Sequence, residues 1–298
     1  MRLPATILLF ACTLLAACAT TTREGRTQFV ANPLLGSVYS DVGLRVKLAT
    51  TTDLDTRGYH RELCPLTGCD TREDFERKVQ TIGERLAQLA YSRYPDLVER
   101  VPKFHFSVVM KADVGTLSNG DGEVVVLGGL RRKGLDDNTL ALLLAREMGH
   151  VISRHHDEDS ATSILFSIAT GLLFPVSNLL RGVAAVAQSG IASSVLSSAA
   201  SYAGSSMVRA SYRSDQVREA DAVAAQLLID AGLDIFDVAD TLNASTSSFG
   251  GDDDWSKEWR VSGRWFAQVA SGPRQDHSRD AQAASLADNR AVSLPALY

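Results

Sequence analysis

The residues with the clearest chemical potential lie close together in one stretch, LLLAREMGHVISRHH (142–156), which contains Arg146, Glu147 and His150. With histidine at position 146 the stretch would read H-E-x-x-H. In that pattern two histidines on one helix face bind a zinc ion, and the glutamate activates the metal-bound water. Arginine offers only donors and stays ionised, so it cannot bind zinc. The sequence therefore keeps the general-base position, Glu147, and one ligand position, His150, but lacks the other ligand.

Helices and a small sheet must position these residues. The residues Asp-Asp-Asn at 136–138 are typical of a helix cap, so we expect a helix that contains the motif. The runs FHFSVVM (104–110) and EVVVLGGL (123–130) predict paired strands, and we expect the second to be an edge strand. Further helices are predicted from Thr71 onward and over 214–234, the latter ending at a glycine.

Two other stretches hold candidate residues. RHHDED (154–159) offers adjacent histidines, which point about 100° apart on a helix and are poor joint ligands. We interpret that stretch as a solvated helix end. The tryptophans of WSKEWRVSGRWFAQVA (255–270) are expected to be core or interface anchors.

The order of these motifs resembles the zinc metallopeptidases of the HtpX and CAAX-prenyl-endopeptidase type, in their periplasmic lipoprotein branch, over about residues 70 to 280. The resemblance implies an α+β, zincin-like (gluzincin) domain that is mostly helical with a small β-sheet. It also implies a third zinc ligand four residues before Asp221, where this chain has Val217. Glu219 lies two residues further along the helix and points about 200° away from Val217.

Two of the three ligand positions, 146 and 217, therefore cannot bind metal in the manner of the family. We hypothesise that the Arg146 guanidinium occupies the space of the ion and pairs with Glu147 or Asp221, which leaves Glu147 as a vestigial general base. No cofactor is expected on this interpretation. The alternative is an active zinc endopeptidase whose site is rebuilt from Glu147, His150, Glu219, Asp221 or the histidines at 155 and 156.

The first residues predict export and lipid attachment. Residues 1–17 form an apolar signal segment that ends in Leu-Ala-Ala before Cys18, and this resembles a bacterial lipobox with Cys18 as the lipidated residue. Alanine after Cys18 favours the outer membrane, on its periplasmic face. We expect residues 18–45 to be a lipidated tether and irregular segment, and 46–298 to be the metallopeptidase-like domain. In that oxidising compartment Cys64 and Cys69 are predicted to form a disulfide.

Residues 160–208 form an unusual insert, first apolar and then rich in Ala, Ser and Gly, with a single charged residue, Arg181, in its apolar part. We interpret it as a buried or interfacial hydrophobic helical hairpin, with a transmembrane hairpin as the alternative.

Three functions remain open at this stage. The chain carries a net charge of −5 and no basic cluster with aromatic residues, so nucleic acid is not expected as a partner. The first hypothesis is a non-catalytic lipoprotein that binds polypeptide clients and acts in outer-membrane protein assembly or quality control. The second is the active zinc endopeptidase, and the third is a purely structural lipoprotein.

Overall fold

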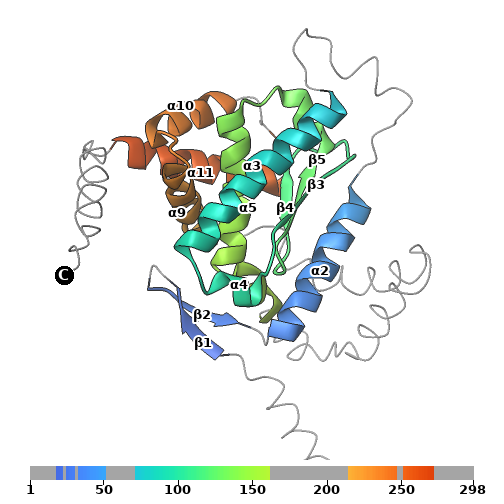
Figure 1. Ribbon diagram of the computed structural model, residues 1–298, viewed down its shortest axis with the longest axis vertical. Helices are drawn as coiled ribbons and strands as arrows, with labels where there is room; N and C mark the ends of the chain where they lie inside the picture. The colour runs from blue at the N-terminus through green and yellow to red at the C-terminus, as the bar shows by residue number, and fades with distance from the viewer. Residues whose placement is uncertain are drawn as a thin grey trace, which may run out of the picture.

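The computed structural model describes residues 18–22, 25–30, 33–51, 71–161, 214–246 and 251–271. Helices dominate and two small sheets accompany them, which confirms the α+β class (Figure 1). The elements are β1 (Cys18–Thr21), β2 (Thr27–Val30), α2 (Pro33–Thr50), α3 (Arg72–Arg93), α4 (Leu97–Arg100), β3 (His105–Val109), β4 (Thr116–Ser118), β5 (Glu123–Leu127), the 3-10 helix η1 (Gly128–Lys133), α5 (Asp137–Ile152), α9 (Ser214–Asp230), α10 (Ile235–Thr246) and α11 (Asp254–Ser271).

Two predicted features lie outside this described part of the chain. The Cys64–Cys69 disulfide is one, and the hydrophobic insert of 160–208, of which only the first two residues are described, is the other. Within the described residues no helix is both long and apolar enough to cross a membrane.

Capping side chains explain where the two long helices of the motif region begin. The Thr71 side chain accepts a hydrogen bond from the Asp74 backbone N–H at the start of α3. The Asp136 side chain accepts one from the Thr139 N–H at the start of α5. Both helices begin where the sequence predicts them, because these side chains satisfy backbone donors that the first helical turn leaves unpaired.

The three-stranded sheet has the order β3-β5-β4, with β3 parallel and β4 antiparallel to β5. The prediction that EVVVLGG forms an edge strand is therefore wrong, because β5 has a neighbour on each side. The central position of β5 agrees with the burial of both of its faces. Val124 and Val126 pack into the helical core, while Val125 and Leu127 pack against Leu44 of α2. A continuous apolar run is typical of a strand covered on both sides.

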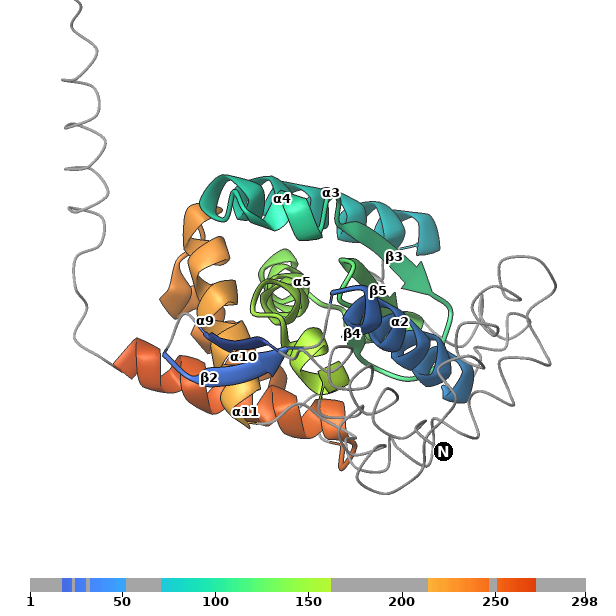
Figure 2. The same cartoon turned by 90° about the horizontal axis from the view of Figure 1, so that it is seen from below.

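The N-terminal region is ordered where an irregular tether was expected, so that part of the prediction is wrong. Strands β1 and β2 form an antiparallel hairpin in which Cys18 lies opposite Val30. Helix α2 follows and covers the sheet face opposite α3 and α5 (Figure 2). The boundary of the metallopeptidase-like domain at residue 46 stays a prediction.

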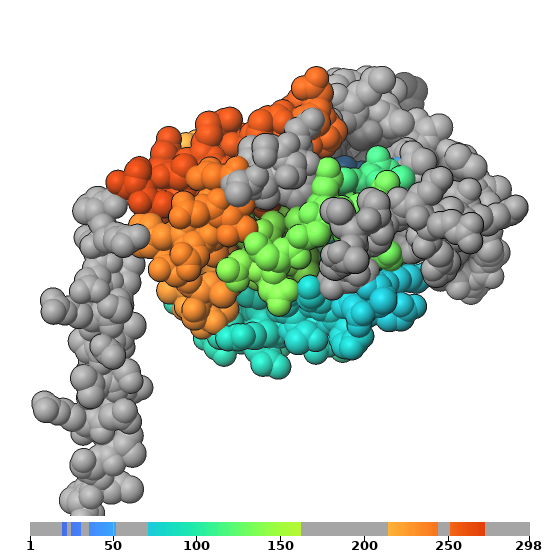
Figure 3. Space-filling model, turned by 90° about the horizontal axis from the view of Figure 1, so that it is seen from above, coloured from blue at the N-terminus to red at the C-terminus, as the bar shows by residue number. Residues whose placement is uncertain are grey.

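Helix α5 is the centre of the molecule, and nearly every one of its residues is buried. In Figure 3 its green atoms lie between the cyan atoms of α3 and the orange atoms of α9 and the C-terminal helices. On α11 the rings of Trp255 and Trp259 stack with centroids 5.6 Å apart, and Trp259 belongs to the core. This placement agrees with the anchor role expected for the tryptophans.

A glycine sets the distance between α5 and α9. A β-carbon added at Gly149 would lie 2.4 Å from the backbone oxygen of Ala220. We predict that Gly149→Ala lowers the free energy of unfolding by about 1–3 kcal/mol, because the helices must move apart. This loss of stability is opposite in sign to the gain that replacing glycine with alanine normally brings in a helix interior. Urea unfolding measures the effect, with Ser92→Ala on the exposed face of α3 as the control. A stabilised Gly149→Ala variant would contradict the close approach.

Candidate functional site

Helices α5, α9 and α11 bring most of the predicted site residues into the protein interior. Arg146, Glu147 and His150 come from α5, and Glu219 and Asp221 come from α9. All five are buried. Their side chains, however, do not converge on one point, and they belong to separate polar clusters.

The first cluster surrounds Arg146, whose side chain is only 2% exposed. Its Nη2 donates a hydrogen bond of 3.2 Å to Glu258 on α11, and its Nε lies 3.7 Å from Oδ1 of Asp221. Asp221 also accepts a 3.0 Å hydrogen bond from the Ser262 hydroxyl. The structure thus places Arg146 beside Asp221, one of the two partners expected for it, and adds Glu258, which no sequence motif indicated.

Burial dominates the electrostatics of this cluster. It raises the pKa of Asp221 to about 7, although the Arg146 guanidinium and the Ser262 hydroxyl act in the opposite direction. Within the described residues, Nη1 of Arg146 and Oδ2 of Asp221 are buried without a hydrogen-bond partner. The charges of Arg146 and Asp221 lie close enough to balance each other, but not all of their polar atoms are hydrogen-bonded. Removal of either residue should therefore lower the stability of the fold.

The second cluster holds Glu147, the general-base position. Both of its carboxylate oxygens accept hydrogen bonds from β4, one from Thr116 Oγ1 at 2.8 Å and one from Ser118 Oγ at 2.7 Å. Ser118 Oγ also lies 3.0 Å from Nε2 of His156. On its outer side Thr116 accepts a hydrogen bond from the indole N–H of Trp255 at 3.3 Å. Glu147 is therefore held against the sheet by two hydroxyl groups.

The third cluster is a chain of contacts that begins at His150. Its Nδ1 lies 2.9 Å from Nδ1 of His155, and Nε2 of His155 lies 3.0 Å from Oε2 of Glu219. Because a carboxylate only accepts, Nε2 of His155 donates to Glu219. With both rings neutral, His150 Nδ1 must then donate to His155. Burial, with the nearby His155 and Arg146, lowers the pKa of His150 well below its ordinary value.

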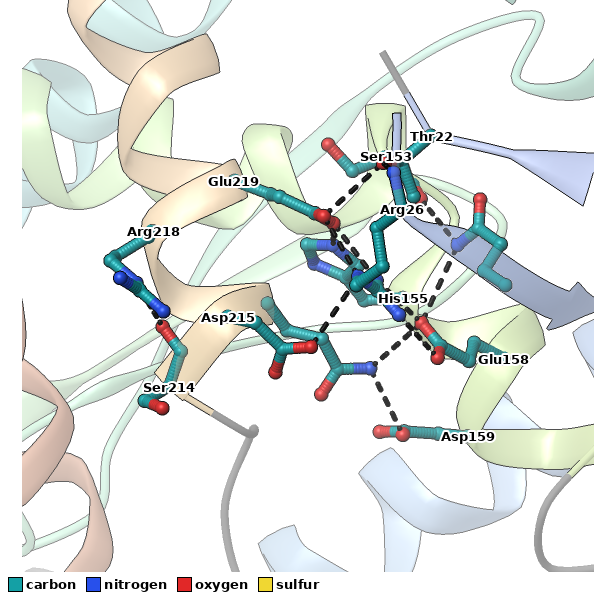
Figure 4. A network of polar contacts seen from close by, with 12 residues as sticks. Thr22, Arg26, Ser153, His155, Glu158, Asp159, Ser214, Asp215, Arg218 and Glu219 are labelled. Atoms are coloured by element: carbon teal, nitrogen blue, oxygen red, sulfur yellow. Dashed lines mark hydrogen bonds and ion pairs between the residues drawn. The ribbon is translucent and has the colours of Figure 1, made fainter. Parts of the chain in front are cut away.

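Arg26, from the turn between β1 and β2, completes this chain (Figure 4). Its guanidinium donates to both oxygens of Glu219, at 2.8 and 2.9 Å, and to both oxygens of Glu158, at 2.7 and 2.9 Å. Although burial opposes it, hydrogen bonding to Arg26 and His155 lowers the pKa of Glu219 to about 2. Glu219 is thus held ionised by a residue about 190 positions earlier in the chain.

The sequence model of peptidase family M48 matches residues 74–276, which is more than half of the chain. The chain belongs to peptidase family M48. No curated protein matches the sequence.

Membership of family M48 confirms the metallopeptidase family expected from the motifs, and it raises the question of whether these residues fit a zinc ion. They do not fit one of the family type. Arg146 cannot act as a ligand, and Val217 is a core residue with 1% exposure. The described residues contain no group of three or more His, Cys, Asp or Glu side chains that could hold a metal ion.

The alternative, a rebuilt zinc site, required several candidate residues to meet at one position. The structure brings His150, His155 and Glu219 together in one chain of contacts, but Asp221 lies with Arg146 and Glu147 lies with β4. The candidates are therefore divided among three clusters in the M48 domain, and each cluster has its own partners.

The interpretation of RHHDED as a solvated helix end is wrong. His155, His156 and the two acidic residues after them are buried. The chain turns at Ser153 and Arg154, where Arg154 has a φ of 61°, and residues 155–161 continue as helix. The two histidines do point in different directions, His155 towards Glu219 and His156 towards Ser118. Each direction meets a polar cluster rather than water.

Sequence reasoning missed several site residues: Arg26, Glu258, Ser262, and two β4 residues, Thr116 and Ser118, whose hydroxyls bind Glu147. Arg26 stands in a segment without a clear period, and the strand beside it, TQFV (27–30), has two polar residues followed by two apolar ones, so it lacks the polar–apolar alternation of a half-buried strand. Glu258 and Ser262 lie on α11 four residues apart, which places both on one helix face. That spacing indicates that both side chains face the same neighbouring element, but it does not identify the element.

We predict that Arg146→Ala lowers the free energy of unfolding by about 3–5 kcal/mol, because it leaves buried carboxylates without their cation. Urea unfolding of the purified protein measures it. The exposed Arg77→Ala on α3 is the matched control and should change stability by no more than about 0.5 kcal/mol. Equal effects of the two substitutions would show that the Arg146 contacts contribute nothing.

His156 should make stability depend on pH. Burial lowers its pKa from 6.5 to about 3 in the folded state. The unfolded chain therefore binds a proton that the folded chain does not, so this contribution is complete above pH 6.5 and is lost as the pH falls towards 3. Relative to His156→Gln, wild type should lose about 1.4 kcal/mol per pH unit in that window.

Asp221 makes an opposite contribution to stability, because its raised pKa favours the folded state as the pH falls. Both wild type and His156→Gln contain Asp221, so this contribution cancels in the difference between them. The control is His105→Gln, at an exposed position on β3. Urea unfolding from pH 7.5 to about pH 4.5 covers the upper part of this window, in which the chain must release the His156 proton in order to fold. Parallel profiles for wild type and His156→Gln would contradict the prediction.

Proposed function

We propose that this chain is a non-catalytic member of peptidase family M48, anchored by lipid to the outer membrane on its periplasmic face. It holds polypeptide clients during outer-membrane protein assembly or quality control. One observation carries the proposal. The position that provides a zinc-binding histidine in the motif is filled by a buried guanidinium with carboxylate partners of its own, Glu258 and Asp221.

The state of Glu147 supports the same conclusion. A general base must accept a proton from a water molecule, so at least one carboxylate oxygen has to face that water. Glu147 is only 4% exposed, and each of its oxygens accepts a hydrogen bond, one from Thr116 and one from Ser118, so little of the carboxylate is open to water. In the proposed function these bonds attach β4 to α5 and make Glu147 a structural residue.

Polypeptide clients remain the proposed partners, but the way they bind must differ from backbone pairing with β5. That strand is central, and the outer strands of the described sheet are β3 and β4. Strand β4 is the better candidate, since Trp255 lies beside it and its side chains contact Glu147 in the former catalytic region. An extended client could add to the outer edge of β4 through main-chain hydrogen bonds, which need no metal.

The proposed lipid anchor is consistent with the position of Cys18. This residue is the first of β1, so an acyl chain attached to it would join a folded hairpin without an intervening tether. The hairpin is fixed to α9 through Arg26. In the proposed function the domain therefore lies close to the membrane surface.

Metal analysis separates the proposed pseudoenzyme from an active zinc endopeptidase. We expect wild-type protein, purified without chelators and dialysed against zinc, to hold far less than one zinc ion per chain. Arg146→His combined with Val217→Glu restores both ligand types of the family and should bind zinc with His150. Val217→Glu alone keeps the guanidinium and is the matched control. Stoichiometric zinc in wild type that is lost in His150→Ala would overturn the proposed function.

A further inference from the structure

A cavity of about 560 Å³ lies between the N-terminal hairpin and the helices, apart from the Arg146 and Glu147 clusters. It is bounded by β1, by the end of α3 and by α4, by the last residues of α5, and by α9. Figure 1 shows the hairpin below α9 and α4. Its volume is in the range of cavities that bind small ligands. The charged residues of its wall are Arg93, Asp96, Arg100, Arg154 and Glu219.

Most of these charges are already balanced. Arg93 forms an ion pair with Asp230, and Arg154 donates to Asp157 at 2.9 Å. Glu219 is bound by Arg26. Arg100 differs from them, because within the described residues no carboxylate lies within ion-pair distance of it. Its guanidinium makes one long hydrogen bond, 3.4 Å from Nη2 to the Ile152 carbonyl oxygen.

Arg100 is partly buried, so its charge has lost part of its hydration. Burial lowers its pKa, with Arg154 acting in the same direction and the carboxylates of Asp157 and Asp96 opposing it. A guanidinium nevertheless stays ionised in proteins. A partly desolvated cation without a close counter-ion is unfavourable, and a bound anion would remove this cost.

Two further features of the wall suggest a binding site. Thr20, on β1, has a buried hydroxyl group without a hydrogen-bond partner in the described part of the chain. Arg154 has a left-handed backbone, with φ at 61°, which is uncommon outside glycine. Strained backbone of this kind concentrates at ligand sites, and here it places an arginine in the wall of the cavity.

We propose that this cavity binds a phosphate group, with Arg100 as its main cationic contact and the Thr20 hydroxyl as a donor. A guanidinium presents paired donors that match phosphate oxygens. The group could belong to free phosphate or to an anionic phospholipid headgroup. The lipid is favoured because Thr20 lies two residues after Cys18, a choice of source that rests on the proposed lipid anchor.

Binding of inorganic phosphate tests the site itself. Isothermal titration with the full chain carrying Cys18→Ser, at constant ionic strength, should detect phosphate binding. Arg100→Gln should weaken it by roughly tenfold or more, since a hydrogen bond to a charged group is lost. Arg77→Gln, which removes an equal charge from an exposed position on α3, should leave binding unchanged. Absence of phosphate binding, or equal binding by wild type and Arg100→Gln, overturns the proposal.

Vesicle flotation then distinguishes the two sources. The same Cys18→Ser protein is mixed with vesicles of phosphatidylcholine alone or with added phosphatidylglycerol. Flotation that requires phosphatidylglycerol and Arg100 identifies a lipid headgroup, and phosphate binding without flotation identifies free phosphate. A peptide with a free C-terminal carboxylate that binds while phosphate does not would show that the ligand class is wrong. Because Arg100 lies outside the Arg146 cluster, the binding experiments can contradict the phosphate site while the zinc content still supports the proposed function, and the reverse is also possible.

Discussion

The buried guanidinium of Arg146 is the constraint on which the arrangement of α5, α9 and α11 depends. A side chain that is 2% exposed cannot keep its charge unless opposite charges lie close to it. No carboxylate of α5 itself serves this purpose, and Asp221 and Glu258 come from the two other helices. One charge therefore fixes the relative position of three helices, and Ser262 holds Asp221 in place.

The same requirement appears with the opposite sign just beyond the C-terminal end of α5. Glu158 and Glu219 are buried carboxylates, and Arg26 of the N-terminal hairpin is the cation that balances them. A zinc ion in a family site would bring two positive charges to the junction of α5 and α9. In this chain Arg146 and Arg26 bring one each, at separate points, and the contact between His150 and His155 lies between them. The hairpin is thus part of the charge balance of the domain.

The sequence predicted those features that depend on local interactions. Thr71 and Asp136 cap helices through backbone groups three residues away, so their role can be recognised without knowledge of the fold. The pair of Arg146 and Asp221 was also among the expected ones, since a buried cation on a motif helix needs a nearby carboxylate. These inferences required only spacing and charge.

What the sequence could not predict depends on which segments cover which surfaces. The helical spacing of His155 and His156 correctly places them on different faces, yet both faces are covered, one by α9 and the hairpin and the other by β4. The run VVVL of β5 is consistent with either an edge or a central strand until α2 is known to cover its second face. Arg26 stands 132 positions from Glu158 and 193 from Glu219, and no local rule connects residues so far apart.

If the proposed loss of the zinc ligands is correct, it cannot have left the remaining polar groups unpaired, because each unpaired polar group in a protein interior costs about 1–3 kcal/mol. In this domain the replacement is systematic. Glu147 accepts hydrogen bonds from two β4 hydroxyls, His150 contacts His155, and position 146 carries a cation with two acidic neighbours. Each group that would perform chemistry in the family instead connects α5 to another element. In the proposed pseudoenzyme the residues of the site hold the helices and the sheet together, and this explains why a buried, polar centre persists without catalysis.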